Sequence, residues 1–243
     1  MSNIYISFIL TIIAGFSTII GYFSIYIKNN NIIIKSLSFS SSVMLFISLF
    51  DLIPQTYILL NNTIKIIPLL LIILISINIG IIISLLIKDS IPISNDVLYK
   101  VGIISMISII IHNIPEGMAT FISTNTNINL GIKLTIAITL HNIPEGISIA
   151  IPIYYSTKSK LKAFVYTALS GMSELIGALI AYLFIKPSNI MLGILFSIIA
   201  GIMIHISIKE LLFTALSYNK RKYTYIYFII GLIFIILYKI VIE

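Results

Sequence analysis

Two stretches decide the fold: residues 101–123, VGIISMISIIIHNIPEGMATFIS, and residues 131–153, GIKLTIAITLHNIPEGISIAIPI. Each stretch is apolar and has about the 20 residues that a helix needs to cross a bilayer. Each carries the hexapeptide His-Asn-Ile-Pro-Glu-Gly near its middle, beginning at His112 and at His141. Because the link between the stretches is short, we expect them to run antiparallel and to place the hexapeptides opposite each other at the bilayer midplane.

The rest of the chain has the same character. Of its 243 residues, 59% are hydrophobic and 9% are charged, and the mean hydropathy is +1.13. Soluble domains are about 25% charged, so the composition excludes one. It predicts an all-α, polytopic membrane protein with eight transmembrane helices in a single domain, residues 1–243. The predicted spans are residues 5–27, 37–60, 66–87, 101–123, 131–153, 163–185, 190–212 and 223–242.

Basic residues predict the orientation, because cytoplasmic loops of membrane proteins retain Lys and Arg. The loops after spans one, three, five and seven carry ten basic residues. The opposite side carries four, Lys65, Lys133, Lys186 and Lys239. We therefore expect both termini outside the cytoplasm, in a multi-pass protein of the plasma (inner) membrane. This loop bias accounts for the net charge of +7, and no nucleic-acid partner is predicted.

Five of the eight acidic residues fall inside predicted spans, where a charge is costly to insert. They are Asp51, Glu116, Glu145, Glu174 and Glu210. In each hexapeptide His and Glu are four residues apart and Asn and Glu three, so all three side chains share one helical face. With no Cys in the chain, imidazole, carboxylate and amide groups suit Zn²⁺, with Fe²⁺, Mn²⁺, Co²⁺ and Cd²⁺ as alternatives. The predicted metal site comprises His112, Asn113, Glu116, His141, Asn142, Glu145 and Glu174.

Proline is expected to shape this site. Pro115 and Pro144 lack an N–H and clash with the preceding turn, so they should free the carbonyls of Ile111 and Leu140 and interrupt each helix with a kink. Interrupted helices that line a cavity are a feature of transporter binding sites. The alternative is that the hexapeptides are polar groups that only hold the helices together.

Three other polar residues in the spans have assignments of their own. Asp51 fits a transport pathway and a structural polar contact equally well. For His205 a hydrogen-bonded packing role is favoured over a place in the pathway. Glu210 is expected to form a local ion pair or a snorkelling pair with the adjacent Lys209, near the cytoplasmic end of span seven.

On the paired hexapeptides, the eight spans and Glu174, the chain resembles the ZIP (Zrt/Irt-like) family of divalent metal transporters, in particular its ZupT-like bacterial branch. The resemblance implies an inverted-repeat bundle (3+2+3), with spans one to three and six to eight around spans four and five. It also implies a binuclear site that shares both motif glutamates. The first metal would be held by Glu116, His141 and Glu145 with His112, and the second by Asn113, Glu116, Asn142, Glu145 and Glu174.

The chain departs from the resemblance at two places. Many relatives carry a His-rich loop between spans three and four, whereas residues 88–100 contain no His. Asp51 stands where the branch commonly has Glu, which keeps the carboxylate and shortens its reach.

Three functions fit these residues. The leading prediction is import of Zn²⁺, and of the alternative divalent ions, into the cytoplasm. An intramembrane metallohydrolase is the second, although the chain lacks the H-E-x-x-H pattern that such a site would use. A metal exporter or antiporter would use the same ligands. No cofactor besides the transported cation is expected, the partners are divalent cations and the lipid bilayer, and a homodimer is left open.

Overall fold

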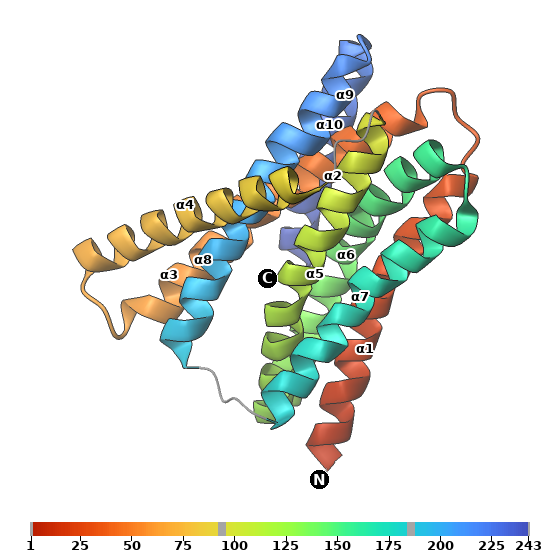
Figure 1. The fold of residues 1–243 in the computed structure, drawn as a ribbon. Helices are drawn as coiled ribbons and strands as arrows, with labels where there is room; N and C mark the ends of the chain where they lie inside the picture. The colour runs from red at the N-terminus through yellow and green to blue at the C-terminus, as the bar shows by residue number, and fades with distance from the viewer. Residues whose placement is uncertain (1, 92–95, 184–187, 243) are drawn as a thin grey trace.

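The computed structural model describes residues 2–91, 96–183 and 188–242, and these residues form helices joined by short connections, without a strand. The helices are α1 (Ser2–Tyr22), α2 (Ile32–Ile47), α3 (Ile53–Asn61), α4 (Ile66–Ser90), α5 (Val97–Thr126), α6 (Ile128–Thr157), α7 (Lys160–Leu183), α8 (Asn189–His205), α9 (Phe213–Ser217) and α10 (Arg221–Ile242). A short 3₁₀ turn, Phe23–Tyr26, follows α1. Figure 1 shows the arrangement.

Two of the membrane helices are not regular throughout. A π-helical segment, Ser48–Leu52, joins α2 to α3, and another, Ile206–Leu212, joins α8 to α9. The two composite helices and the other six long ones correspond to the eight predicted spans, which confirms the all-α membrane fold. By length and composition, seven of them meet the requirements of a membrane span within the described residues, and α10, with 22 residues, matches the eighth. The predicted end of span six, Ile185, and the counted Lys186 lie outside the described residues.

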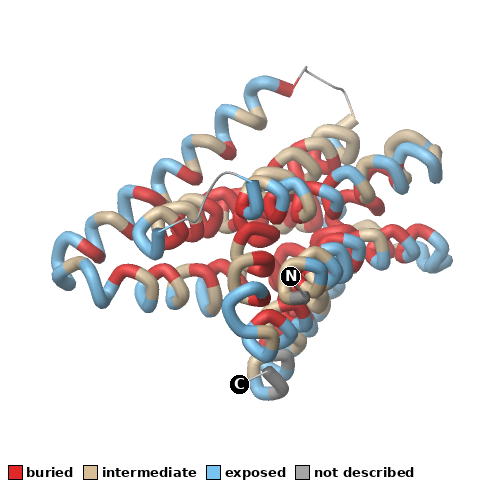
Figure 2. The backbone as a smooth tube through the Cα atoms, turned by 90° about the horizontal axis from the view of Figure 1, so that it is seen from below, coloured by how far each residue is buried: buried red, intermediate tan, exposed pale blue. Residues whose placement is uncertain are grey.

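The outer surface suits a lipid environment. On α4, for example, Ile67 is 72% exposed, and Leu70, Leu74 and Leu86 are more than half exposed. Figure 2 shows that exposed residues lie on the outer sides of the helices and buried residues toward the centre. Apolar side chains that face outward are stable in hydrocarbon, so the polar residues described below are the ones that face the interior.

Helix packing follows an internal symmetry. The pair α1 and α6 corresponds to α7 and α5, and the pair α4 and α8 corresponds to α10 and α2. α1 also packs on α7, and α5 packs on α6. These correspondences exchange spans one, two and three with spans six, seven and eight, and span four with span five, as the predicted 3+2+3 inverted repeat requires.

Glycines set the closest approaches in the symmetric pairs. A Cβ on Gly146 would overlap the carbonyl oxygen of Thr18, and a Cβ on Gly117 would overlap the carbonyl oxygen of Glu174. Gly15 and Gly171 face each other's backbone in the same way. These glycines, which include the last residue of each hexapeptide, let α1 and α7 lie directly against α6 and α5.

The expected interruption of each helix at its hexapeptide is wrong, whereas the expected kinks stay a prediction. α5 and α6 continue as α-helices through Pro115 and Pro144. Both prolines are buried, so packing from neighbouring helices supports the turn that lacks a hydrogen bond. In the part of the chain that the structure describes, the helical segments that are not α-helical are the 3₁₀ turn after α1 and the two π-helical segments.

Candidate metal centre

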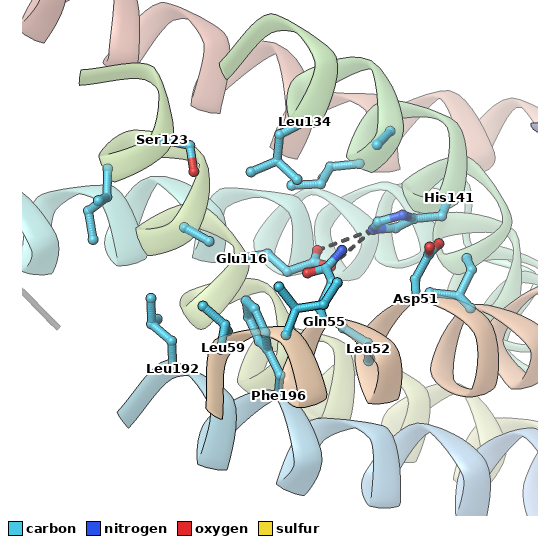
Figure 3. A pocket seen from close by; sticks show the side chains of 16 residues that line it. Asp51, Leu52, Gln55, Leu59, Glu116, Ser123, Leu134, His141, Leu192 and Phe196 are labelled. Atoms are coloured by element: carbon cyan, nitrogen blue, oxygen red, sulfur yellow. Dashed lines mark hydrogen bonds and ion pairs between the residues drawn. The ribbon is translucent and has the colours of Figure 1, made fainter. Parts of the chain in front are cut away.

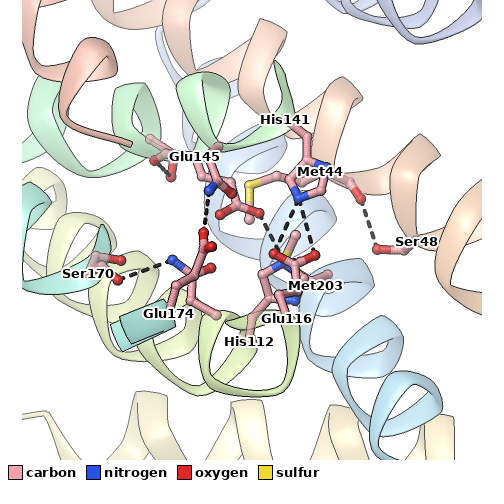
Figure 4. A network of polar contacts seen from close by, with 12 residues as sticks. Met44, Ser48, His112, Glu116, His141, Glu145, Ser170, Glu174 and Met203 are labelled. Carbon is pink, nitrogen blue, oxygen red and sulfur yellow. Dashed lines mark hydrogen bonds and ion pairs between the residues drawn. The ribbon is translucent and has the colours of Figure 1, made fainter. Parts of the chain in front are cut away.

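Four side chains from α5 and α6 form the centre of the site (Figure 4). His112 Nε2 lies 3.2 Å from Glu116 Oε1 and 3.3 Å from Glu145 Oε1. His141 Nε2 lies 3.1 Å from the same Glu116 oxygen. We call these four residues the His–Glu cluster. The structure thus brings together the imidazoles and carboxylates of both hexapeptides, as their spacing predicted.

The cluster has the donors of a metal site. One nitrogen of His112, one nitrogen of His141 and one carboxylate oxygen of Glu145 lie within 4.8 Å of one another. All four residues of the cluster are at most 5% exposed. In the described residues, the ion-pair partners of Glu116 and Glu145 are imidazoles, and no Lys or Arg contacts either carboxylate. Buried carboxylates need a compensating cation, and a divalent ion coordinated by imidazole and carboxylate would supply it.

The two asparagines and Glu174 lie beside the cluster. Asn113 Nδ2 donates to the Ser170 carbonyl oxygen at 3.1 Å. Asn142 Nδ2 donates to the Ala14 carbonyl oxygen at 2.9 Å and to Glu174 Oε1. These bonds leave Asn113 Oδ1, Asn142 Oδ1 and Glu174 Oε2 buried without a hydrogen-bond partner in the described structure. An unpartnered buried oxygen is costly, so these three atoms are available to a cation.

A cavity of about 240 Å³ reaches one side of the cluster (Figure 3). Its lining includes Glu116 and His141, and it extends past Ser123 and Leu134 toward the α5–α6 link. His112 and Glu145 are not part of the lining. The cavity therefore reaches the cluster from the side on which α5 ends and α6 begins.

The other predicted pathway residues have different surroundings. Asp51 lines the cavity, and its Oδ1 lies 3.5 Å from Lys239 Nζ. His205 Nδ1 lies 2.8 Å from Ser84 Oγ, and His205 is absent from both the cavity lining and the group of metal donors. Asp51 is thus near the cluster, whereas the structure does not bring His205 to it.

The predicted partner of Glu210 is wrong. Glu210 Oε1 lies 2.8 Å from Lys88 Nζ of α4. The Lys209 ammonium lies 4.8 Å from the centroid of the Phe213 ring instead. Consecutive helical residues point in different directions, so Lys209 and Glu210 do not face each other.

Sequence reasoning missed two methionines. Met44 and Met203 are fully buried, and Figure 4 places both beside the His–Glu cluster. A Met in an apolar helix is usually a packing residue, so hydropathy does not indicate that either Met lies beside the cluster. One signal was present, because Met44 and Met203 each precede an intramembrane acid, Asp51 and Glu210, by seven residues.

Comparison with known proteins gives consistent results. The profile described as ZIP Zinc transporter matches residues 88–239, which include both hexapeptides and Glu174. A zinc transporter ZupT from Clostridium perfringens is 37% identical over 91% of this chain and 90% of the relative. The ZupT of Chlorobium luteolum is 38% identical over 91% and 92%. The ZupT of Oceanobacillus iheyensis is 50% identical over a shorter region, 53% of this chain and 49% of the relative.

Proposed function

Because this chain belongs to the ZIP family of zinc transporters, we propose that it carries Zn²⁺ into the cytoplasm through the His–Glu cluster. It is a membrane protein and a transporter of divalent metal, not an enzyme. The metallohydrolase alternative is therefore set aside. The direction of transport, the ligand set and the range of ions are the parts that we propose.

One observation carries the proposal: paired carboxylates and imidazoles are buried at the inner end of a cavity. Glu116 and His141 line that cavity, and His112 and Glu145 lie behind them. A divalent cation that enters would exchange its water for imidazole nitrogens and carboxylate oxygens. The same donors accept Fe²⁺, Mn²⁺, Co²⁺ and Cd²⁺, which we include as candidate substrates.

We propose a binuclear arrangement within the site. Glu116, His141 and Glu145, with His112, hold the first ion. The second ion is held by both shared carboxylates and by the oxygens of the neighbouring amides and Glu174. Support comes from the three buried oxygens that lack a partner, Asn113 Oδ1, Asn142 Oδ1 and Glu174 Oε2. A second cation would be coordinated by these three oxygens and would give each of them a partner.

The cavity lies on the side that the distribution of basic residues predicts to be outside the cytoplasm. Entry from that side corresponds to import. The same prediction places both termini outside, in the plasma (inner) membrane. The expected partners remain the transported cations and the lipid bilayer, without a resident cofactor or nucleic acid, and a homodimer remains a prediction.

Transport is tested with the purified chain in liposomes that contain a Zn²⁺-sensitive dye. External Zn²⁺ should raise the dye signal, and the Lys133→Gln variant, altered at an exposed position of α6, should match the parent. Protein-containing liposomes that admit no more Zn²⁺ than empty ones would contradict the proposal. Single Cys residues at Thr126 and Ser159 then report orientation in cells, since the chain has no Cys of its own. Export would appear as Zn²⁺ loss from cells in which only Thr126→Cys is labelled from outside.

A further inference from the structure

The two hexapeptides align α5 with α6 residue by residue. On α6, Leu134 and Ala137 precede His141 by seven and four residues, and both line the cavity. On α5, the residues at the same distances before His112 are Ser105 and Ser108. Since α5 and α6 are antiparallel, Ser105 and Ser108 lie on the opposite side of the cluster from the cavity.

Ser105 and Ser108 are polar and do not line the cavity, whereas their α6 counterparts, Leu134 and Ala137, are apolar and line it. Both are fully buried, and neither hydroxyl has a hydrogen-bond partner in the described structure. Thr120 of the same helix also lacks a partner, whereas Thr124 donates to the Thr120 carbonyl oxygen of its own helix. An unpartnered buried hydroxyl is costly, and two in line with His112 form a polar stripe where apolar packing would be more stable.

The π-helical segments give a second, independent correspondence. Each contains an acid, Asp51 or Glu210, and each acid pairs with a Lys near the carboxyl end of another membrane helix. Asp51, at the cavity, lies 3.5 Å from Lys239 of α10. Glu210, on the opposite side, lies 2.8 Å from Lys88 of α4 and is only 5% exposed. The Lys88–Glu210 ion pair is therefore shorter than the Asp51–Lys239 ion pair, which lies at the cavity.

The Lys88–Glu210 ion pair lies between two elements that pack against α5, the helix that carries Ser105 and Ser108. α5, which carries the stripe, packs against the segment Ile206–Leu212 that carries Glu210, and also against α4, which carries Lys88. The Lys88–Glu210 pair thus ties together the two elements that flank α5 on this side. π-helical turns in membrane helices allow local rearrangement and occur often at functional positions.

We propose that Ser105 and Ser108 line a closed half of the transport route, leading from His112 to the side opposite the cavity, and that the Lys88–Glu210 ion pair holds it shut. The ligand of this route is a hydrated divalent cation, for which the two hydroxyls replace water. The inference rests on the proposed transport function and extends it to the exit side. It assigns Lys88 and Glu210 as residues that control access, and neither is a ligand of the His–Glu cluster.

The test uses single Cys residues in the full chain, held in lipid nanodiscs so that both membrane faces are accessible. A charged, membrane-impermeant thiol reagent should modify Ser108→Cys slowly in the parent. Adding Lys88→Gln should raise the rate by about tenfold, since it leaves the buried Glu210 carboxylate without its counter-ion and so favours the open form. Glu210→Gln should have the same effect, and exchanging the two charges, Lys88→Glu with Glu210→Lys, should restore slow modification.

Three controls make the result specific. Ala137→Cys, in the cavity, should react quickly in every background. Thr167→Cys, buried on α7, should stay slow in every background. Lys239→Gln, which alters the pair on the cavity side, should leave Ser108→Cys slow.

The inference is overturned if Ser108→Cys stays slow with Lys88→Gln and with Glu210→Gln. It is also overturned if Thr167→Cys accelerates in parallel, because that would mean general loosening. Since labelling needs no metal, it is independent of the flux assay. Absence of Zn²⁺ flux in the parent would defeat the proposed function, whereas flux in the parent without the change in labelling would defeat only this inference.

Discussion

The two hexapeptides have the same sequence and different surroundings. Glu116 of the first copy and His141 of the second line the cavity and are 4% and 5% exposed. His112 of the first and Glu145 of the second are fully buried and lie outside the lining. Each side of the cluster therefore takes one residue from each copy. Antiparallel helices explain the exchange, because the Glu end of one motif lies level with the His end of the other.

This comparison separates what a motif determines from what its environment determines. The hexapeptide sets the identity and spacing of the donors, and the packing of α2, α3 and α8 decides which donors meet the cavity. If the two sides form one site, damage to either should have the same effect. If only the accessible side binds metal, Glu116 should matter much more than Glu145.

The largest expected effect comes from Glu116→Gln and Glu145→Gln. Each removes one of the two shared charges while keeping the side-chain shape, so each should lower the initial rate of Zn²⁺ flux more than about 100-fold, beyond the 10–100-fold loss seen for groups that only orient ligands. Flux is measured in liposomes at matched protein amounts, with Lys133→Gln as the control. Near-normal flux in Glu145→Gln would show that the buried side takes no part.

A smaller loss is expected at Glu174, which has no acidic twin. Gly15, Thr18 and Gly21 of α1 occupy the same spacing as Gly171, Glu174 and Gly177 of α7, so the repeat places Thr18 opposite Glu174.

Glu174→Gln should leave measurable Zn²⁺ flux with an altered preference among Zn²⁺, Mn²⁺ and Cd²⁺, because only the second ion loses a ligand. Thr18→Val removes the corresponding hydroxyl and should change this preference less. Complete loss of flux in Glu174→Gln would assign Glu174 to both ions.

The two asparagines should differ in the same experiment. Asn142 Nδ2 donates to Glu174 Oε1, whereas Asn113 Nδ2 donates only to a backbone carbonyl in the described contacts. Asn142→Asp therefore sets a carboxylate beside Glu174, which should tighten cation binding and slow release more than Asn113→Asp does. Competition by a panel of cations measures this. If both variants transported every cation as the parent does, the amides would not be ligands.

The smallest effects concern the helix starts that hold the two copies. Asp96 accepts hydrogen bonds from the backbone N–H groups of Leu98 and Tyr99 at the start of α5. Asn127 accepts from those of Asn129 and Leu130 at the start of α6. Replacing either cap with Ala should lower the free energy of unfolding by about 1 kcal/mol.

Of the two caps, only Asp96 should make a contribution to the free energy of unfolding that depends on pH. The hydrogen bond from Ser156, with the two backbone N–H bonds, lowers the pKa of Asp96 from its ordinary value of 3.8. A lowered carboxyl pKa stabilises the fold above the ordinary value, and this stabilisation is lost as the pH falls through the folded-state pKa. In thermal unfolding, the difference in melting temperature between Asp96→Ala and the parent should shrink below pH 3.8. The difference in melting temperature between Asn127→Ala and the parent should stay constant. Equal pH dependence for both variants would contradict the assignment.

Much of the fold and of the metal centre could be predicted from the sequence. The eight spans follow from hydropathy, and the contacts of His112, Glu116, His141 and Glu145 follow from an identical motif on adjacent antiparallel helices. The match with the ZIP family agrees with the resemblance of the motifs.

What the sequence did not reveal depends on contacts between distant segments. The partner of Glu210 is Lys88, far away in the chain, and no local rule selects it. The π-helical segments and the positions of Met44 and Met203 beside the cluster arise from packing of α2 and α8 against α6 and α5. Pro115 and Pro144 do not end α5 or α6, and the π-helical segments lie in other helices, where no proline rule places them.

The central claim is that both copies of the hexapeptide form one shared metal site, and Zn²⁺ binding tests it most directly. Equilibrium dialysis of the purified full chain compares the parent with Glu116→Gln and Glu145→Gln, with Lys133→Gln as the control. The account predicts two ions bound by the parent and by the control, and a matching loss of both stoichiometry and affinity in the two Glu variants. Parent-like binding by Glu145→Gln together with loss in Glu116→Gln would contradict it.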